Sequence, residues 1–145
     1  MKLGGLAYFS LLLFLLASPF ELARGSYNVD VTADDQISFE KLIDGIKSDP
    51  KIQSVEQALT LIPQPFFQNY VLVYRSRSLQ QSSFESPRAI VFGQSGKFIF
   101  SFNGDPKHRG YSELEIIQFR EDTNRFEFRE ITFKPGRAPT ISEAN

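Results

Sequence analysis

The chain has 145 residues, with 16 lysines and arginines against 17 aspartates and glutamates, one histidine and no cysteine. At this length we expect one folded domain, preceded by any targeting segment at the N-terminus. The absence of cysteine excludes disulfides, thiolate metal sites and covalently attached haem, so no cofactor is predicted. Positive and negative charges are balanced, and the sequence has no basic stripe of the kind that nucleic-acid-binding proteins carry.

The first 25 residues are typical of a secretory signal peptide. Lys2 precedes an uncharged apolar run, Leu6–Ala17, and Ser18-Pro19 then favours a turn. The run is shorter than the roughly 20 residues that a membrane-spanning helix needs, although a retained anchor is the alternative. We therefore predict that residues 1–25 are removed, that the protein is periplasmic or secreted, and that it contacts the membrane only during export.

Two short helices are predicted after this segment. The first spans Asp35–Lys47, where apolar residues recur with mostly helical spacing. These residues are Ile37, Leu42, Ile43 and Ile46. The second helix begins at Ser54, whose hydroxyl can cap it, and ends before Pro63, which cannot continue it.

Five β-strands are predicted in succession after the helices. Each is short, rich in Val, Ile, Phe and Tyr, and bounded by turn-forming residues. They are Asn69–Arg77, Arg88–Gly93, Lys97–Asn103, Ser112–Arg120 and Arg125–Phe133. Because side chains alternate along a strand, Phe98, Phe100 and Phe102 should share one buried face. Helices followed by a run of strands favour an α+β fold, with two N-terminal helices packed on a five-stranded, mostly antiparallel meander.

The last predicted strand carries a change of pattern. Its apolar residues move from one face of the strand to the other between Phe128 and Ile131, because Phe126 and Phe128 occupy even positions and Ile131 and Phe133 odd positions. We therefore expect a β-bulge or a strand end near Arg129. The final residues show no periodicity. We therefore assign residues 26–137 to a single domain and residues 138–145 to a flexible tail.

Basic residues around the loop Ser78–Pro87 are the best candidates for a ligand site. Arg75 and Arg77 share a strand face, and Arg88 begins the next strand across the loop. Guanidinium groups beside serine and glutamine side chains can bind a carboxylate or a phosphate. The predicted ligand-binding residues are Arg75, Arg77, Ser78, Gln80, Arg88 and Arg129. Their ligand would be a small anion or an acidic patch on another envelope protein; a surface ladder of arginines and glutamates is the alternative.

No catalytic or metal-binding residue is predicted. His108 is the single histidine and lies among turn residues, three positions after Asp105, and the chain has no Gly-x-Ser-x-Gly elbow. The leading expectation is therefore an exported, non-catalytic binding or interaction module of the cell envelope. A small periplasmic hydrolase that uses a serine and His108 is the alternative.

Several segments together resemble a known group of proteins. They are Arg75-Ser-Arg-Ser-Leu-Gln80, Pro87-Arg88-Ala-Ile-Val-Phe-Gly93, Phe102-Asn103-Gly104, Leu114-Glu115 with Gln118-Phe119, and Phe126-Glu-Phe-Arg-Glu-Ile131. Over about Ile62–Phe133 the chain is similar to the N-terminal domain of uncharacterised exported bacterial proteins, whose longer members continue into a Cys-x-x-Cys-His segment typical of c-type cytochromes. This sequence has no cysteine, so the resemblance implies no haem site here. It implies a stand-alone version of the domain or a truncated remnant of a longer cytochrome-like protein.

Overall fold

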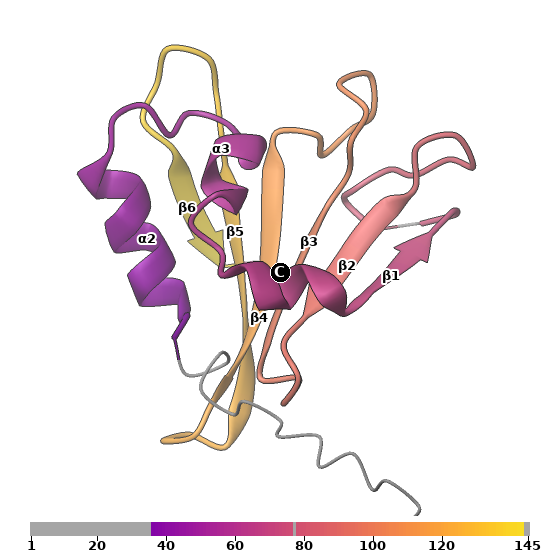
Figure 1. Ribbon diagram of the computed structural model, residues 1–145. Helices are drawn as coiled ribbons and strands as arrows, with labels where there is room; N and C mark the ends of the chain where they lie inside the picture. Colours follow the sequence, from indigo (N-terminus) through magenta and orange to yellow (C-terminus); the bar gives the residue numbers. More distant parts are fainter. Residues whose placement is uncertain (1–35, 77, 144–145) are drawn as a thin grey trace, which may run out of the picture.

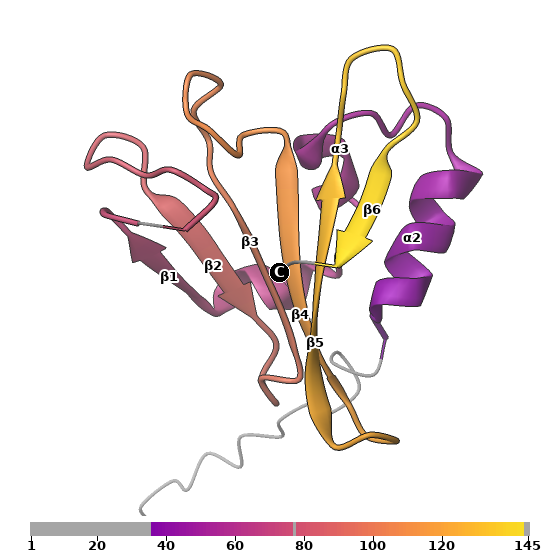
Figure 2. The ribbon, with the colours of Figure 1, turned by 180° about the vertical axis from the view of Figure 1, so that it is seen from behind.

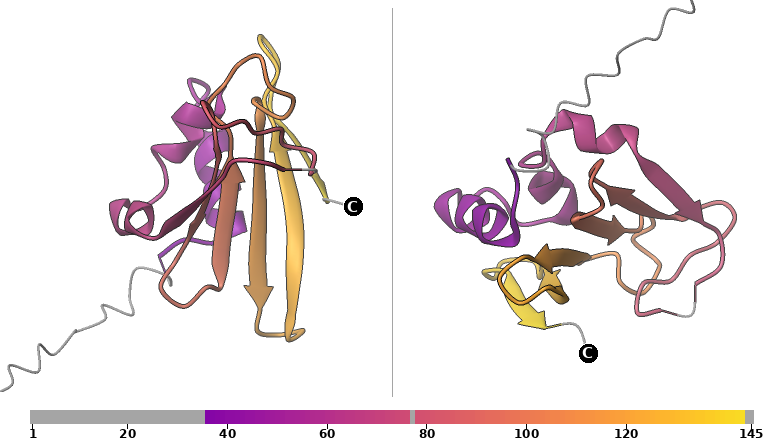
Figure 3. Two further views of the ribbon diagram at one scale, coloured as in Figure 1. Left: turned by 90° about the vertical axis from the view of Figure 1, so that its right-hand side faces the viewer. Right: turned by 90° about the horizontal axis from the view of Figure 1, so that it is seen from below.

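The computed structural model describes residues 36–76 and 78–143, so the predicted signal peptide lies outside the described residues (Figure 1). An antiparallel sheet carries six strands in the order of the chain. They are β1 (Tyr70–Val73), β2 (Arg88–Phe92), β3 (Phe98–Phe102), β4 (Glu113–Arg120), β5 (Arg125–Thr132) and β6 (Thr140–Glu143). In the described part of the chain, three short helical segments come before the sheet: α2 (Phe39–Ser48), α3 (Val55–Leu59) and the 3-10 helix η1 (Gln64–Gln68). The helices lie on one side of the strands (Figure 3, left).

Serine hydroxyls set where α2 and α3 begin. α2 begins at Phe39 rather than at Asp35 as predicted, because the Ser38 hydroxyl accepts a hydrogen bond from the Lys41 backbone N–H at 3.2 Å. The cap predicted at Ser54 is confirmed, since its hydroxyl accepts from the Gln57 N–H at 3.3 Å. None of the helices in the described part of the chain is long and apolar enough to cross a membrane.

The aromatic face predicted for β3 is confirmed. Phe98 and Phe100 are buried, and Phe102 is half-buried beside them. The unpredicted helix η1 covers this face: the ring of Phe66 meets Phe98 edge-on at 6.0 Å between centroids, and Phe67 meets Phe100 at 5.9 Å. Edge-to-face pairs at such separations are favourable beyond the area they bury. The central core therefore forms between η1 and β3, with α2 and α3 extending it.

The sheet has one strand more than the five predicted. Thr140–Glu143 was assigned to a flexible tail, but it forms β6 and pairs antiparallel with β5, with Ile141 opposite Ile131. A short strand with mixed polar residues has no recognisable periodicity. It forms here because β5 offers an unpaired edge and the turn at Gly136, with φ of +69°, brings the chain back to it.

The β-bulge or strand end predicted near Arg129 is wrong, because β5 continues to Thr132. Pairing between β4 and β5 is unbroken from Glu113 opposite Thr132 to Arg120 opposite Arg125. The apolar positions move from one face to the other because β5 carries apolar side chains on both of its faces. Ile131 is buried toward the helices, whereas Phe126 and Phe128 point to the other face and are 52% and 51% exposed. We call this second face the open face; it is turned toward the viewer in Figure 2, with the helices behind it.

Candidate functional site

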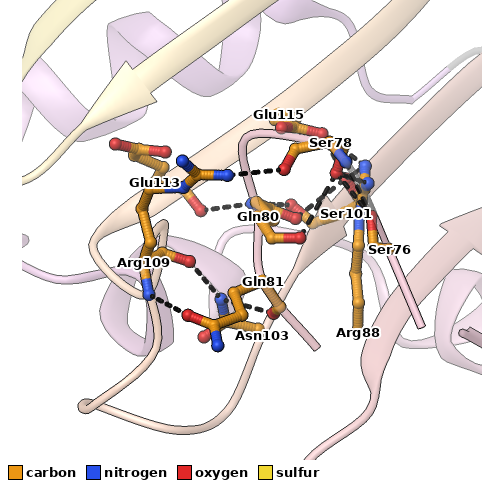
Figure 4. Close-up of polar contacts among 10 residues, drawn as sticks. All are labelled: Ser76, Ser78, Gln80, Gln81, Arg88, Ser101, Asn103, Arg109, Glu113 and Glu115. Carbon is orange, nitrogen blue, oxygen red and sulfur yellow. Dashed lines mark hydrogen bonds and ion pairs between the residues drawn. The ribbon is translucent and has the colours of Figure 1, made fainter. Parts of the chain in front are cut away.

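A cluster of polar side chains on the open face joins the loop after β1 to β2, β3 and β4 (Figure 4). Arg88 forms an ion pair with Glu115 of β4 and donates hydrogen bonds to the hydroxyls of Ser78 and Ser101, the latter at 2.6 Å. The side chains of Arg88 and Glu115 are only 13% and 17% exposed. A charge-assisted network of this kind is strongest where water is largely excluded.

Gln80 ties the loop to the sheet most directly. Its side chain is fully buried, and its amide nitrogen donates to the backbone carbonyls of Ser101 at 3.0 Å and Glu113 at 2.8 Å. Its amide oxygen accepts from the Ser101 hydroxyl at 3.2 Å. Through these bonds Gln80 bridges the end of β3 and the start of β4.

The loop before β4 packs against the same segment. Arg109 donates from Nε to the carbonyl of Leu79 at 3.0 Å and from a terminal nitrogen to the carbonyl of Ser78 at 3.1 Å. Gly110 has φ of +81°, and a Cβ atom there would lie 2.8 Å from the Cα of Gln80. Only glycine allows both this conformation and this approach.

The structure brings three of the predicted ligand-binding residues together, namely Ser78, Gln80 and Arg88. Apart from the buried Nε of Arg88, which has no hydrogen-bond partner, the side-chain groups described above bond to the protein itself. The Arg88 guanidinium has Glu115 as its partner, which corresponds to the arginine–glutamate ladder, and Gln80 has no exposed surface. The cluster therefore fixes the loop on the sheet.

The other predicted residues lie elsewhere. Arg129 is on the helix face of β5, with its guanidinium carbon 4.9 Å from the centre of the Phe39 ring and an ion pair to Glu127 at 3.1 Å. It is thus on the opposite side of the sheet from the cluster. Arg75 is exposed just beyond β1, and Arg77 lies outside the described residues.

Beside the cluster the open face carries an acidic group. Partial burial raises the pKa of Glu113 above its usual value, and the negative charges of Glu130 and Glu115 raise it further, against the opposing charge of Arg109. Within the described ranges, no set of three or more His, Cys, Asp or Glu residues is arranged to hold a metal ion.

His108 is not arranged as a catalytic base. Its Nε2 lies 3.6 Å from a carboxylate oxygen of Asp105, and its Nδ1 is buried without a hydrogen-bond partner. Nucleophilic catalysis by serine needs a hydroxyl within hydrogen-bond reach of the base. No serine of the described ranges bonds to either ring nitrogen, so the geometry offers the hydrolase alternative no support.

Exposed apolar side chains gather at the first strand. Most of the large apolar side chains exposed in the described residues belong to β1 and the loop after it, and we call them the β1 surface. They are Tyr70, Val71, Leu72, Tyr74, Leu79 and Phe84. Phe84 is 79% exposed, and its ring lies 5.3 Å from that of Tyr74. The sequence analysis did not identify this strand as an exposed apolar surface.

The backbone of β1 is also open on one side. β1 lies at the end of the strand order, next to β2 only. The Phe92 N–H bonds to the carbonyl of Asn69 at 3.0 Å. This bond makes Asn69 and Phe92 a hydrogen-bonded pair of the ladder. Hydrogen-bonded and non-hydrogen-bonded pairs alternate along antiparallel strands, so the next pair, Tyr70 with Val91, and the pair of Leu72 with Ala89 are not hydrogen-bonded. The N–H and C=O groups of Tyr70 and Leu72 therefore point away from β2.

Comparisons of this chain with protein-family models, with curated proteins and with solved structures found no match. The resemblance to the exported bacterial domains therefore stays a prediction. The function has to be argued from the surfaces described above.

Proposed function

We propose that this chain is a non-catalytic interaction module of the cell envelope, which binds an extended segment of a partner protein along β1. One observation carries the proposal: outward-pointing backbone groups and exposed apolar side chains occur together on the same strand. In strand addition, backbone hydrogen bonds supply affinity and alternate side chains supply specificity. β1 has both elements.

The two edges of the sheet differ in how they are protected. Soluble proteins usually shield an edge strand with charges, proline or a bulge. The Tyr70–Val73 strand has no charge and no proline, and it pairs regularly with β2. The opposite edge, β6, follows Pro139 and carries the hydroxyl side chains of Thr140 and Ser142. The unprotected edge is therefore β1.

The side chains around β1 indicate the chemistry of the partner. Tyr70 and Leu72 point to one face of the sheet and Val71 to the other, so an added strand needs apolar residues on both faces. Arg75, exposed just beyond the strand, favours an acidic residue at the adjoining end of the partner segment. We thus expect a short apolar segment that ends in an aspartate or glutamate.

The polar cluster contributes to this function indirectly. It fixes the backbone at Leu79 and Gln80, so the Leu79 side chain needs little further ordering when a partner binds. Ordering costs at an interface are typically about 0.5–1.5 kcal/mol per side chain, and a fixed surface avoids part of them.

The test is to select extended ten-residue peptides from a display library against the full chain and to compare their binding to Leu72→Pro. Proline removes an N–H that points away from β2, so β1 should keep its pairing within the sheet. Leu72→Ala is the matched control, because it shortens the side chain and keeps the N–H. We expect Leu72→Pro to weaken the selected peptides at least tenfold and to weaken them more than Leu72→Ala does. Bound peptide should slow amide exchange at Tyr70 and Leu72.

Peptides that bind Leu72→Pro as well as the wild type, or that protect other amides, would contradict the proposal. Sedimentation of the purified protein gives a separate outcome: dimers abolished by Leu72→Pro would make a second copy, rather than a partner, the occupant of this edge.

Export is tested by mass spectrometry of the envelope fraction. An N-terminus after the Leu6–Ala17 run is expected, and an intact Met1 would indicate a retained anchor.

A further inference from the structure

A groove of about 480 Å³ lies between α2, the segment after it and the turn from β5 to β6. Figure 1 shows this turn, in yellow, beside the connection between α2 and α3. Its apolar lining includes four isoleucines: Ile43, Ile46, Ile52 and Ile141. The first three are at most 6% exposed, whereas Ile141 is 38% exposed. The volume is within the range typical of small-molecule sites, about 300–1,000 Å³.

Two cations reach the groove from opposite walls. Lys47 comes from the last turn of α2, and Arg137 comes from the β5–β6 turn. Both are exposed, and neither forms an ion pair with a described residue. The single acid in the lining, Asp49, accepts a hydrogen bond from the Lys51 N–H at 2.9 Å. The groove therefore has an excess of one positive charge.

We propose that this groove binds a free monocarboxylate with an unbranched alkyl chain. The carboxylate would lie between Lys47 and Arg137, and the chain would lie along the isoleucines. One excess positive charge matches a monoanion better than a doubly charged phosphate. The lining contains no aromatic side chain that could stack on a planar ring, so an alkyl chain fits better than an aryl group.

This site is independent of the proposed partner surface. β1 and β6 are at opposite ends of the strand order, and the groove lies at the β6 end. It also involves none of the arginines predicted from the sequence. Leu72→Pro should therefore leave carboxylate binding unchanged, which separates the two proposals experimentally.

The test is calorimetric titration of the full chain with hexanoate, octanoate and decanoate, below the concentrations at which they form micelles. Each additional buried methylene should tighten binding by about fourfold, until the chain outgrows the groove. Arg137→Gln should weaken octanoate at least fivefold and leave octan-1-ol unchanged. Lys51→Gln is the matched control, because Lys51 is exposed and lies outside the groove lining.

Ala138→Trp provides a second readout, because it fills the groove from an exposed turn position. It should abolish binding of both octanoate and octan-1-ol without lowering the thermal midpoint. The proposal fails if octanoate does not bind at millimolar concentration, if affinity is independent of chain length, or if Lys51→Gln weakens binding as much as Arg137→Gln. Tighter binding of phenylacetate than of octanoate would also overturn it.

Discussion

Replacing Gln80 with alanine should destabilise the domain strongly, although this residue occupies a polar loop. Its side chain is fully buried and takes part in three hydrogen bonds, two of them to backbone carbonyls at the ends of β3 and β4. Alanine leaves both carbonyls without this donor and opens a small cavity. The loop would then lose its principal attachment to the sheet.

The expected magnitude follows from those bonds. A typical intramolecular hydrogen bond contributes about 0.5–1.5 kcal/mol to stability, so three bonds give about 1.5–4.5 kcal/mol. Small domains have total stabilities of about 5–15 kcal/mol. With a urea dependence of about 1–3 kcal/mol per molar, the unfolding midpoint should fall by about 1–2 M.

Urea unfolding followed by circular dichroism measures this change, and the neighbouring residue provides a control. Gln81 is exposed, and its side chain accepts a single long bond, from the Arg109 N–H at 3.4 Å, so Gln81→Ala should change stability by less than about 0.5 kcal/mol. Gln80→Met keeps the length of the side chain and removes its donors, so it should destabilise about as much as Gln80→Ala. If Gln80→Ala and Gln81→Ala differ by less than 0.5 kcal/mol, the structural role of Gln80 is refuted and a ligand-binding role regains weight.

Three further predictions concern the core, the close approach of two loops and pH. Phe100→Ala should cost about 3–5 kcal/mol, measured by thermal unfolding, whereas Phe128→Ala on the open face should cost far less because Phe128 is 51% exposed; similar losses would mean that the two faces are misassigned. Gly110→Ala should lower the thermal midpoint, because its Cβ would come within 2.8 Å of the opposite backbone, whereas Gly104→Ala, with nothing within 4 Å, should be nearly neutral. Glu113 binds its proton more tightly in the folded state, so its contribution to stability falls as the pH rises from about 4.5 through its raised pKa. Glu113→Gln should accordingly stabilise the protein at pH 7 and have little effect at pH 3, and a loss of stability at pH 7 would contradict this.

Local sequence patterns determined much of the fold. Five of the six strands were predicted in order, because β-branched and aromatic residues bounded by turn residues act over a few positions. The Ser54 cap and the aromatic face of β3 followed from equally local rules, a hydroxyl before a helix and a period of two. A mostly antiparallel sheet with short helices was therefore readable from the chain alone.

Features that depend on residues distant in the sequence could not be predicted from local patterns. β6 forms because β5 needs a partner, and the slipped pattern after Phe128 reflects a strand with apolar residues on both faces. Burial of Gln80 depends on carbonyls of Ser101 and Glu113, which are 21 and 33 residues away in sequence. No local pattern encodes such a separation.

The same distinction applies to the candidate sites. The sequence alone marked a loop rich in Arg, Ser and Gln, because those side chains suit an anion. Only the tertiary structure decided that Arg88 already has Glu115 as its partner and that Arg129 lies on the opposite face. It likewise decided that β1 is an edge, since strand order, rather than composition, determines which backbone groups remain unpaired.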